Sequence, residues 1–157
     1  MRALALTVLL VSASCGYHLG TPNSRLPQGV SKVRVPLAVN RTAEPNCEVF
    51  VTEAVREDYA RAGKYDEKSE TALELTVLNV QGAPFVSGPG RLPTYRLQLQ
   101  VEVKLNRAGA IVGQFVSTQK EEFPSGGDTL LTEGNRASAL KRLAELVGRD
   151  VGERFSN

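Results

Sequence analysis

Twelve residues near the middle of the chain, 95–106, alternate between apolar and polar side chains without a break. Successive side chains of a strand point to opposite faces, so this period of two predicts one long strand with a dry face and a wet face. The chain must therefore build a sheet that buries one face. The apolar positions are Tyr95, Leu97, Leu99, Val101, Val103 and Leu105, and the polar ones are Arg96, Gln98, Gln100, Glu102, Lys104 and Asn106.

A hairpin follows this strand. Residues 106–109 (Asn-Arg-Ala-Gly) are typical of a tight turn, and residues 111–122 are the returning strand. The apolar residues of the returning strand have both parities, which leaves its inward face undecided: Ile111 and Phe115 have one parity, Val112 and Val116 the other.

Two more strands are predicted upstream. Residues 73–77 alternate, and Leu78 and Val80 then continue in the opposite phase, which indicates a bulge or an exit from the sheet. Residues 82–93, rich in Gly and Pro, are expected to be a long loop. Residues 32–40 alternate with Val33, Val35, Leu37 and Val39 on one face, and Pro36 implies an edge position or a bulge.

Two amphipathic helices complete the pattern. The first has Thr42 or Glu44 as its cap, Pro45 in its first turn and Gly63 as its stop. The second begins between Thr129 and Asn135. Their apolar stripes are Val51, Val55, Tyr59 and Ala62, with Ala54 beside them, and Leu140, Leu143, Ala144, Val147 and Val151.

The predicted order is strand, helix, three strands, helix. Because each strand has a wet face, the helices are expected to cover one face of the sheet only. The sequence therefore predicts an α+β two-layer sandwich, with a mixed sheet of about four strands and two helices on one face, as a single domain over residues 32–157.

The first fourteen residues have the layout of an export signal. Met1-Arg2 is a short positive region, residues 3–11 are apolar, and small residues precede Cys15. The apolar run is too short to span a bilayer, so residues 1–14 are expected to be cleaved. Cys15-Gly16 resembles the bacterial lipobox, which predicts acylation of Cys15 and a tether over residues 15–31. Ser12 stands where a lipobox usually has Leu, and an ordinary signal with an incidental cysteine is the alternative.

Composition excludes several function classes. Cleavage removes 14 of the 157 residues, leaving 143, and without Arg2 the 19 Lys and Arg fall to 18 against 17 Asp and Glu. This balance gives no reason to expect a nucleic-acid partner. If Cys15 is acylated, Cys47 is the one remaining thiol, and it is interpreted as incidental or semi-buried.

The sequence offers little that could carry catalysis or a cofactor. His18 is the single histidine and lies in the predicted tether, so neither a zinc site nor a Ser-His-Asp arrangement is expected. Gly148 and Gly152 have the spacing of membrane-helix contacts, but Arg149 and Asp150 lie between them. We expect a protein that is not an enzyme and has no cofactor or metal.

Three sequence blocks together resemble the LPS-assembly lipoprotein family, LptE. They are residues 15–19 (Cys-Gly-Tyr-His-Leu), residues 33–36 (Val-Arg-Val-Pro), and residues 40–45, from Asn-Arg-Thr into Glu-Pro. The predicted element order and length agree with that family. The resemblance implies an outer-membrane lipoprotein that plugs the large β-barrel LptD, supports its assembly, helps to place lipopolysaccharide at the cell surface and can bind it.

Four basic residues are candidates for binding the phosphates of lipopolysaccharide: Arg91, Arg96, Arg107 and Lys120. Phe85 could touch acyl chains or the barrel wall, or could equally fold back on the core. A solvated surface charge is the alternative for each basic residue. For the whole chain the alternative is an accessory lipoprotein of another envelope transporter or secretion machine.

Overall fold

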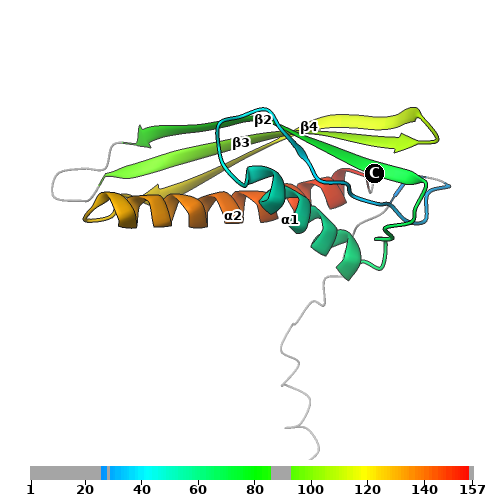
Figure 1. Ribbon diagram of the computed structural model, residues 1–157, viewed down its shortest axis with the longest axis horizontal. Coiled ribbons are helices and arrows are strands. Elements are labelled where there is room, and N and C mark those ends of the chain that lie inside the picture. Colours follow the sequence, from blue (N-terminus) through cyan, green and yellow to red (C-terminus); the bar gives the residue numbers. More distant parts are fainter. Residues whose placement is uncertain (1–25, 28, 86–92, 156–157) are drawn as a thin grey trace, which may run out of the picture.

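The computed structural model describes residues 26–27, 29–85 and 93–155. Its sheet has the strand order β1-β2-β3-β4, with β1 parallel to β2 and the other pairs antiparallel. Figure 1 shows the sheet as one layer and the helices as the other, with α2 running along the sheet. The predicted α+β fold is confirmed. The elements are β1 (Val39–Asn40), α1 (Cys47–Arg61), β2 (Thr71–Phe85), β3 (Thr94–Arg107), β4 (Ala110–Pro124) and α2 (Thr129–Arg154).

Strand β3 is the centre of the core, as its alternation predicts. Its five apolar residues from Leu97 to Leu105 are fully buried, whereas its polar residues from Arg96 to Asn106 are half-exposed. All five predicted apolar residues of α2 are buried against this face. At about 25 cal/mol per Å² of apolar surface, this burial is the main stabilising contribution to the fold.

Strand β2 contains the predicted bulge and is longer than expected. Its register against β3 shifts between Val77 and Asn79, where the sequence changes phase. Gly82–Phe85 pair with Leu97–Thr94 of β3, so the prediction of a loop from Gly82 is wrong for these four residues. The composition of Gly82–Phe85 favours a loop, but the regular alternation of β3 beside them provides a strand to pair with, and the sheet continues through this segment.

The N-terminal strand is broken at Pro36, and this corrects one prediction. Val33 and Val35 are buried as expected, but Leu37 and Val39 are exposed and Ala38 is buried instead. Between the bridge at Arg34 and β1, the backbone bonds to α1 side chains rather than to β2. The Arg56 side chain donates to the Val35 carbonyl at 2.8 Å, and the Ala38 N–H donates to Thr52 Oγ1 at 2.9 Å.

Helix α1 begins later than predicted. Asn46, with φ of 61°, is its N-cap residue, and Pro45 lies in the preceding turn. Thr42 lies too early to be the cap: its N–H and hydroxyl donate to Asn40 Oδ1 at 2.9 and 2.8 Å, and its hydroxyl oxygen accepts from the Glu44 N–H at 3.2 Å, before the helix begins. The predicted stop is confirmed: Gly63, with φ of 68°, donates to the Ala60 carbonyl. The next N–H, from Lys64, donates to the Tyr59 carbonyl, which completes a Schellman motif.

The hairpin turn and the inward face of β4 are now defined. Ala108 and Gly109 have φ of 51° and 85°, which are the conformations of a type I′ turn. From Gly113 to Phe123, the residues of β4 that share the parity of Phe115 point inward, including the buried Ser117 and Phe123. The register against β3 shifts between Leu105 and Asn106, so Ile111 lies opposite Asn106 and is exposed although it has the same parity. Val112, at the shift, and Val116, opposite Glu102 on the open face, are exposed as well.

The two helices approach closely where α2 has glycine. A Cβ built on Gly148 would lie 2.9 Å from the carbonyl oxygen of Ala54 on α1. This position must be glycine for the backbones to come so near, which explains the small residue noted in the sequence. No helix in the described part of the chain is long and apolar enough to cross a membrane.

Some predictions fall outside the described residues. These are the export signal over residues 1–14, the acylated Cys15, the motif at residues 15–19 and Arg91. Leu26 and Val30, at the end of the range assigned to the tether, pack against the core.

Candidate functional site: the open face of the sheet

The polar side chains that β2, β3 and β4 direct away from the helices form one continuous surface, which we call the open face. Directly opposite residues of paired strands share a face, so the register defines its rows. Strands of about 14 residues at about 3.3 Å per residue make the open face about 45 Å long. One end carries the β3–β4 hairpin, and the other carries Phe85, Thr94 and Pro124.

Arg96 is held in place at the far end from the hairpin. Its Nε and Nη2 atoms donate to Glu122 Oε1 at 3.2 and 2.6 Å across the β3–β4 pair. Its guanidinium also lies 4.3 Å from the centre of the Phe85 ring. The ring therefore packs on the outer side of the sheet instead of folding back on the core. A phosphate at Arg96 would have to share its charge with Glu122.

A second network lies toward the hairpin and centres on Glu102. Lys104 Nζ donates to one carboxylate oxygen at 2.8 Å, and Gln114 Nε2 donates to the other at 2.9 Å. The hydrogen bond from Lys104 is the main cause that lowers the pKa of Glu102 below its usual value. Glu102 is thus ionised at neutral pH, and each of its carboxylate oxygens already accepts one hydrogen bond within the sheet.

Two rows between these networks carry almost no charge. One row consists of Asn79, Gln100 and Thr118, and the other consists of Gln81, Gln98 and Lys120. We call these six residues the amide rows. Lys120 is exposed and makes no ion pair within the described residues. Its ammonium group is therefore the basic group of the open face that is available to an anion.

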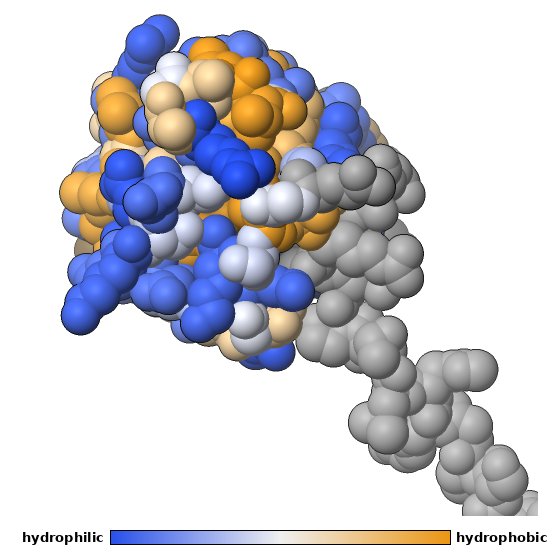
Figure 2. All heavy atoms as spheres, turned by 90° about the vertical axis from the view of Figure 1, so that its right-hand side faces the viewer, coloured by the Kyte–Doolittle hydropathy of each residue, from blue (hydrophilic) through white to orange (hydrophobic). Residues whose placement is uncertain are grey.

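The predicted phosphate-binding residues do not converge. Arg96 and Lys120 lie in neighbouring rows at one end. Arg107 lies beside Gly29 at the hairpin end, eleven residues from Arg96 along β3, or about 36 Å away. Figure 2 looks at the hairpin end, where apolar side chains gather at the top of the molecule around the hairpin of Figure 1.

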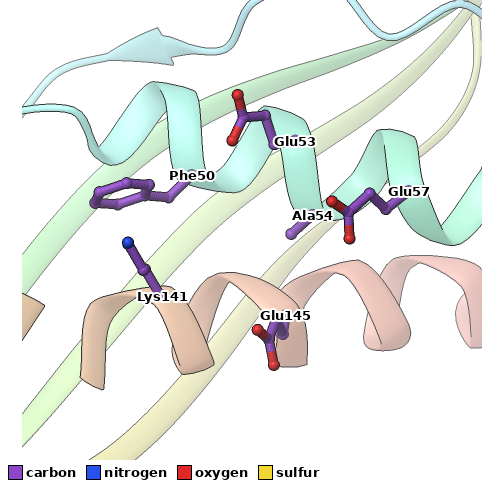
Figure 3. Close-up of a pocket in the computed structure, with 6 residues that line it drawn as sticks. All are labelled: Phe50, Glu53, Ala54, Glu57, Lys141 and Glu145. Carbon is purple, nitrogen blue, oxygen red and sulfur yellow. The ribbon is translucent and has the colours of Figure 1, made fainter. Parts of the chain in front are cut away.

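A hollow on the other side of the molecule lies between the two helices. It has a volume of about 250 Å³ and is lined by Phe50, Glu53, Ala54, Glu57, Lys141 and Glu145. Figure 3 shows Lys141 of α2 pointing toward Phe50 of α1, and the ammonium nitrogen lies 5.4 Å from the ring centre. Glu53, Glu57 and Glu145 line the hollow farther along the two helices. Within the described residues, no group of His, Cys, Asp and Glu is arranged to hold a metal.

A second hollow, of about 320 Å³, opens under the end of the sheet that carries Arg96. Its lining includes the stacked rings of Tyr95 and Phe123 and the side chain of Arg136. Arg136 makes a two-pronged ion pair with Glu44, with Nη1 to Oε1 at 2.7 Å. Sequence reasoning missed this pair because its members are 92 residues apart and no local pattern connects Glu44 with Arg136.

Cys47 is fully buried at the start of α1. Burial, with Glu44 and Glu48 adding to it, raises the pKa of its thiol to about 12. A thiol that stays protonated and covered is not a nucleophile, so Cys47 is a packing residue.

Comparison with known proteins places this fold in a family. Residues 30–155 match the family model described as LptE, lipopolysaccharide-assembly. That range includes the open face and both helices. No curated protein matches the sequence significantly.

Solved structures share the fold at low identity. A lipoprotein candidate from Caulobacter crescentus CB15 superposes with a TM-score of 0.61 at 16% identity, covering 82% of this chain and 90% of its own. The rare lipoprotein B of Shewanella oneidensis superposes with a TM-score of 0.53 at 14% identity, covering 76% and 89%. These likenesses concern the fold alone.

Proposed function

Because this chain belongs to the LptE family of lipopolysaccharide assembly, we propose that it is an outer-membrane lipoprotein that plugs an LptD-type β-barrel. In that position it supports the barrel and takes part in placing lipopolysaccharide at the cell surface. Acylated Cys15 would hold it to the outer-membrane lipid. It would need no catalytic activity and no cofactor.

The amide rows are the observation that supports this role best. Large barrels have polar, water-filled lumens. A plug must therefore present a surface that can exchange hydrogen bonds with polar walls without burying unpaired charge. Five of the six side chains of the amide rows are neutral donors and acceptors, and the charges on either side are already paired in the Arg96 and Glu102 networks.

The partner can be tested directly. A tag placed after Asn157 allows the complex to be purified from outer membranes in mild detergent and identified by mass spectrometry. We expect a heat-modifiable barrel of the LptD kind in one-to-one amount. If the chain co-purified with a transporter or secretin subunit instead, it would be an accessory lipoprotein of another machine.

The anchor has its own test. Cells grown with radioactive palmitate should label the chain, and the Cys15→Ser variant should remain unlabelled and uncleaved. Labelling of the variant would contradict acylation at Cys15.

We further propose that Lys120 binds a phosphate of lipopolysaccharide, with Arg96 and Arg91 assisting and Arg107 acting separately at the hairpin end. Lys120→Gln should weaken lipopolysaccharide binding about threefold to tenfold, because an exposed charge-assisted hydrogen bond contributes about 1 kcal/mol. Lys68→Gln is the matched control, since it removes one exposed positive charge just before β2, at the hairpin end and far from the amide rows. Equal losses in both variants would indicate a general charge effect rather than a site at Lys120.

A further inference from the structure

The first turn of α2 exposes two neighbouring leucines. Leu130, at 85%, is the most exposed large apolar side chain in the described part of the chain, and Leu131 beside it is 58% exposed. Neither lines one of the two hollows described above, so both project from the surface. Residues 128–132, which we call the α2 tip, lie at the end of the molecule opposite the β3–β4 hairpin (Figure 1). Single exposed leucines are normal, but an adjacent pair at one end indicates a contact region.

The outward side of α2 carries no charge for three turns after this pair. Residues three and four apart share a side of a helix, so Leu130 continues into Gly134 and Ala137, and all three are exposed. The next residue on this side is Lys141, about 16 Å along the axis from Leu130. There α1 begins to cover α2, because Lys141 contacts Phe50. The uncharged part of α2 is therefore also the part without a helix beside it (Figure 1).

Hydrogen bonds within the α2 tip satisfy several of its polar groups. Asp128 Oδ1 accepts from the Leu131 N–H at 2.8 Å. The Asp128 carbonyl accepts from the N–H and the hydroxyl of Thr132, at 3.1 and 2.8 Å. The Thr132 hydroxyl oxygen accepts in turn from the Gly126 N–H at 2.9 Å. Because hydrocarbon offers no partners to polar groups, such internal bonding favours entry into an apolar layer.

We infer that the α2 tip inserts shallowly into the hydrocarbon of a phospholipid membrane. Leu130 and Leu131 lie among the acyl chains, and Lys141 lies at the level of the headgroup phosphates. Asp128 and Glu133 limit the depth, because an ionised carboxylate does not leave water without a partner. Helices that lie at a membrane surface bury their apolar side about 5–10 Å deep, and the α2 tip needs no more than this.

A membrane suits the α2 tip better than a protein partner does. Two side chains that project from the surface would need a matching pocket in a protein, whereas a fluid acyl layer adapts to them. The proposed anchor also brings the chain to a membrane, and it enters the domain at the hairpin end, where Gly29 lies beside Arg107. Anchor and α2 tip thus lie at opposite ends and hold the domain lengthwise on the membrane. This arrangement rests on the proposed acylation of Cys15, and it describes the lipoprotein before it meets a barrel.

Tryptophan fluorescence tests the insertion. The chain has no tryptophan, so Leu130→Trp provides a single reporter in the α2 tip. Leu37→Trp is the matched control, since Leu37 is 61% exposed and lies next to β1. The mature chain, made without acylation, is coupled through Cys15 to a maleimide phospholipid in vesicles of phosphatidylethanolamine and phosphatidylglycerol. Cys47 is buried and does not react.

The two reporters should behave differently in these vesicles. We expect the emission of Leu130→Trp to shift to the blue and to be quenched by phospholipids with brominated acyl chains. The emission of Leu37→Trp should remain that of a tryptophan in water. Because the coupling replaces the natural anchor, a chain that is not acylated in cells would contradict the proposed anchor and would leave this result unchanged.

A second substitution measures the contribution of the leucine pair. In the Leu130→Trp chain, Leu131→Gln should lower the ratio of inserted to free tip about tenfold or more, the effect of one leucine side chain leaving hydrocarbon. Leu37→Gln should leave this ratio unchanged. Circular dichroism without vesicles would check that each variant is folded. Equal quenching of both reporters, no quenching of Leu130→Trp, or a blue shift that appears only when lipopolysaccharide is added would overturn the inference.

Discussion

Gly148 shows how one missing side chain sets the distance between two helices. Alanine at this position should destabilise the fold although it favours helix formation. The Cβ would lie 2.9 Å from the Ala54 carbonyl oxygen. Overpacking costs about 1–3 kcal/mol, and the gain in helix propensity is at most about 1 kcal/mol. We expect Gly148→Ala to lower the free energy of unfolding by about 1–2 kcal/mol in urea titrations.

Gly134 is the control for that prediction. It lies on the same helix, and an added Cβ would meet nothing within 4 Å. Gly134→Ala should therefore raise the free energy of unfolding by up to about 1 kcal/mol. If both variants raised the free energy of unfolding, helix propensity, and not the close approach of the two helices, would determine the result.

Tyr59 carries a buried hydroxyl without a hydrogen-bond partner within the described residues. Burial, with Asp58 adding to it, raises the pKa of the phenol, so the group stays neutral. Because an unpaired buried polar group is unfavourable, Tyr59→Phe should leave stability unchanged or raise it by up to about 1 kcal/mol. Thermal unfolding measures this. A loss of more than about 1 kcal/mol would mean that the hydroxyl has a partner such as a bound water.

At the scale of elements, the β3–β4 hairpin has a turn that is not optimal. Ala108 adopts a φ of 51°, a conformation that asparagine tolerates much better. Ala108→Asn should raise the free energy of unfolding by about 0.5–1 kcal/mol, seen as a higher midpoint in urea. Gly109→Ala, at a φ of 85° and with open space around it, should do the reverse. A destabilising Ala108→Asn would contradict the type I′ assignment.

The elements also show what the sequence can and cannot reveal. The alternation of β3 and the stripe of α2 predict their buried residues because a single surface decides each pattern. The prediction for the segment around Leu37 and Val39 is wrong because Pro36 interrupts the strand pairing. Side chains of α1 form hydrogen bonds with the backbone of this segment instead. The sequence leaves the inward face of β4 undecided because apolar residues occur at both parities, with Phe115 at one and Val112 and Val116 at the other. Packing against α2 turns the side of Phe115 inward.

The open face illustrates the same limit for the site. The sequence predicts its polar residues, since they alternate with the core. It does not reveal that Glu122 pairs with Arg96 or that Arg107 lies at the opposite end, because both depend on strand register.

At the scale of the molecule, the ion pair between Glu44 and Arg136 joins the segment before α1 to the beginning of α2. Both side chains are mostly buried, at 12% and 29% exposure. A double-mutant cycle with Glu44→Gln and Arg136→Met should give a coupling free energy of about 1–3 kcal/mol in urea unfolding. A coupling under about 0.5 kcal/mol would assign the pair no role beyond that of a surface contact.

The parallel pairing of β1 with β2 has a consequence for how the chain reaches this structure. β2, β3 and β4 follow one another in sequence and pair as neighbours in the sheet, so this meander can form early. Val33, Val35 and the apolar side of α1 are synthesised before the strands that cover them. They therefore remain exposed until the meander exists. We expect docking of the N-terminal segment to be the last folding step, and the newly synthesised chain to depend most on protection from aggregation during that interval.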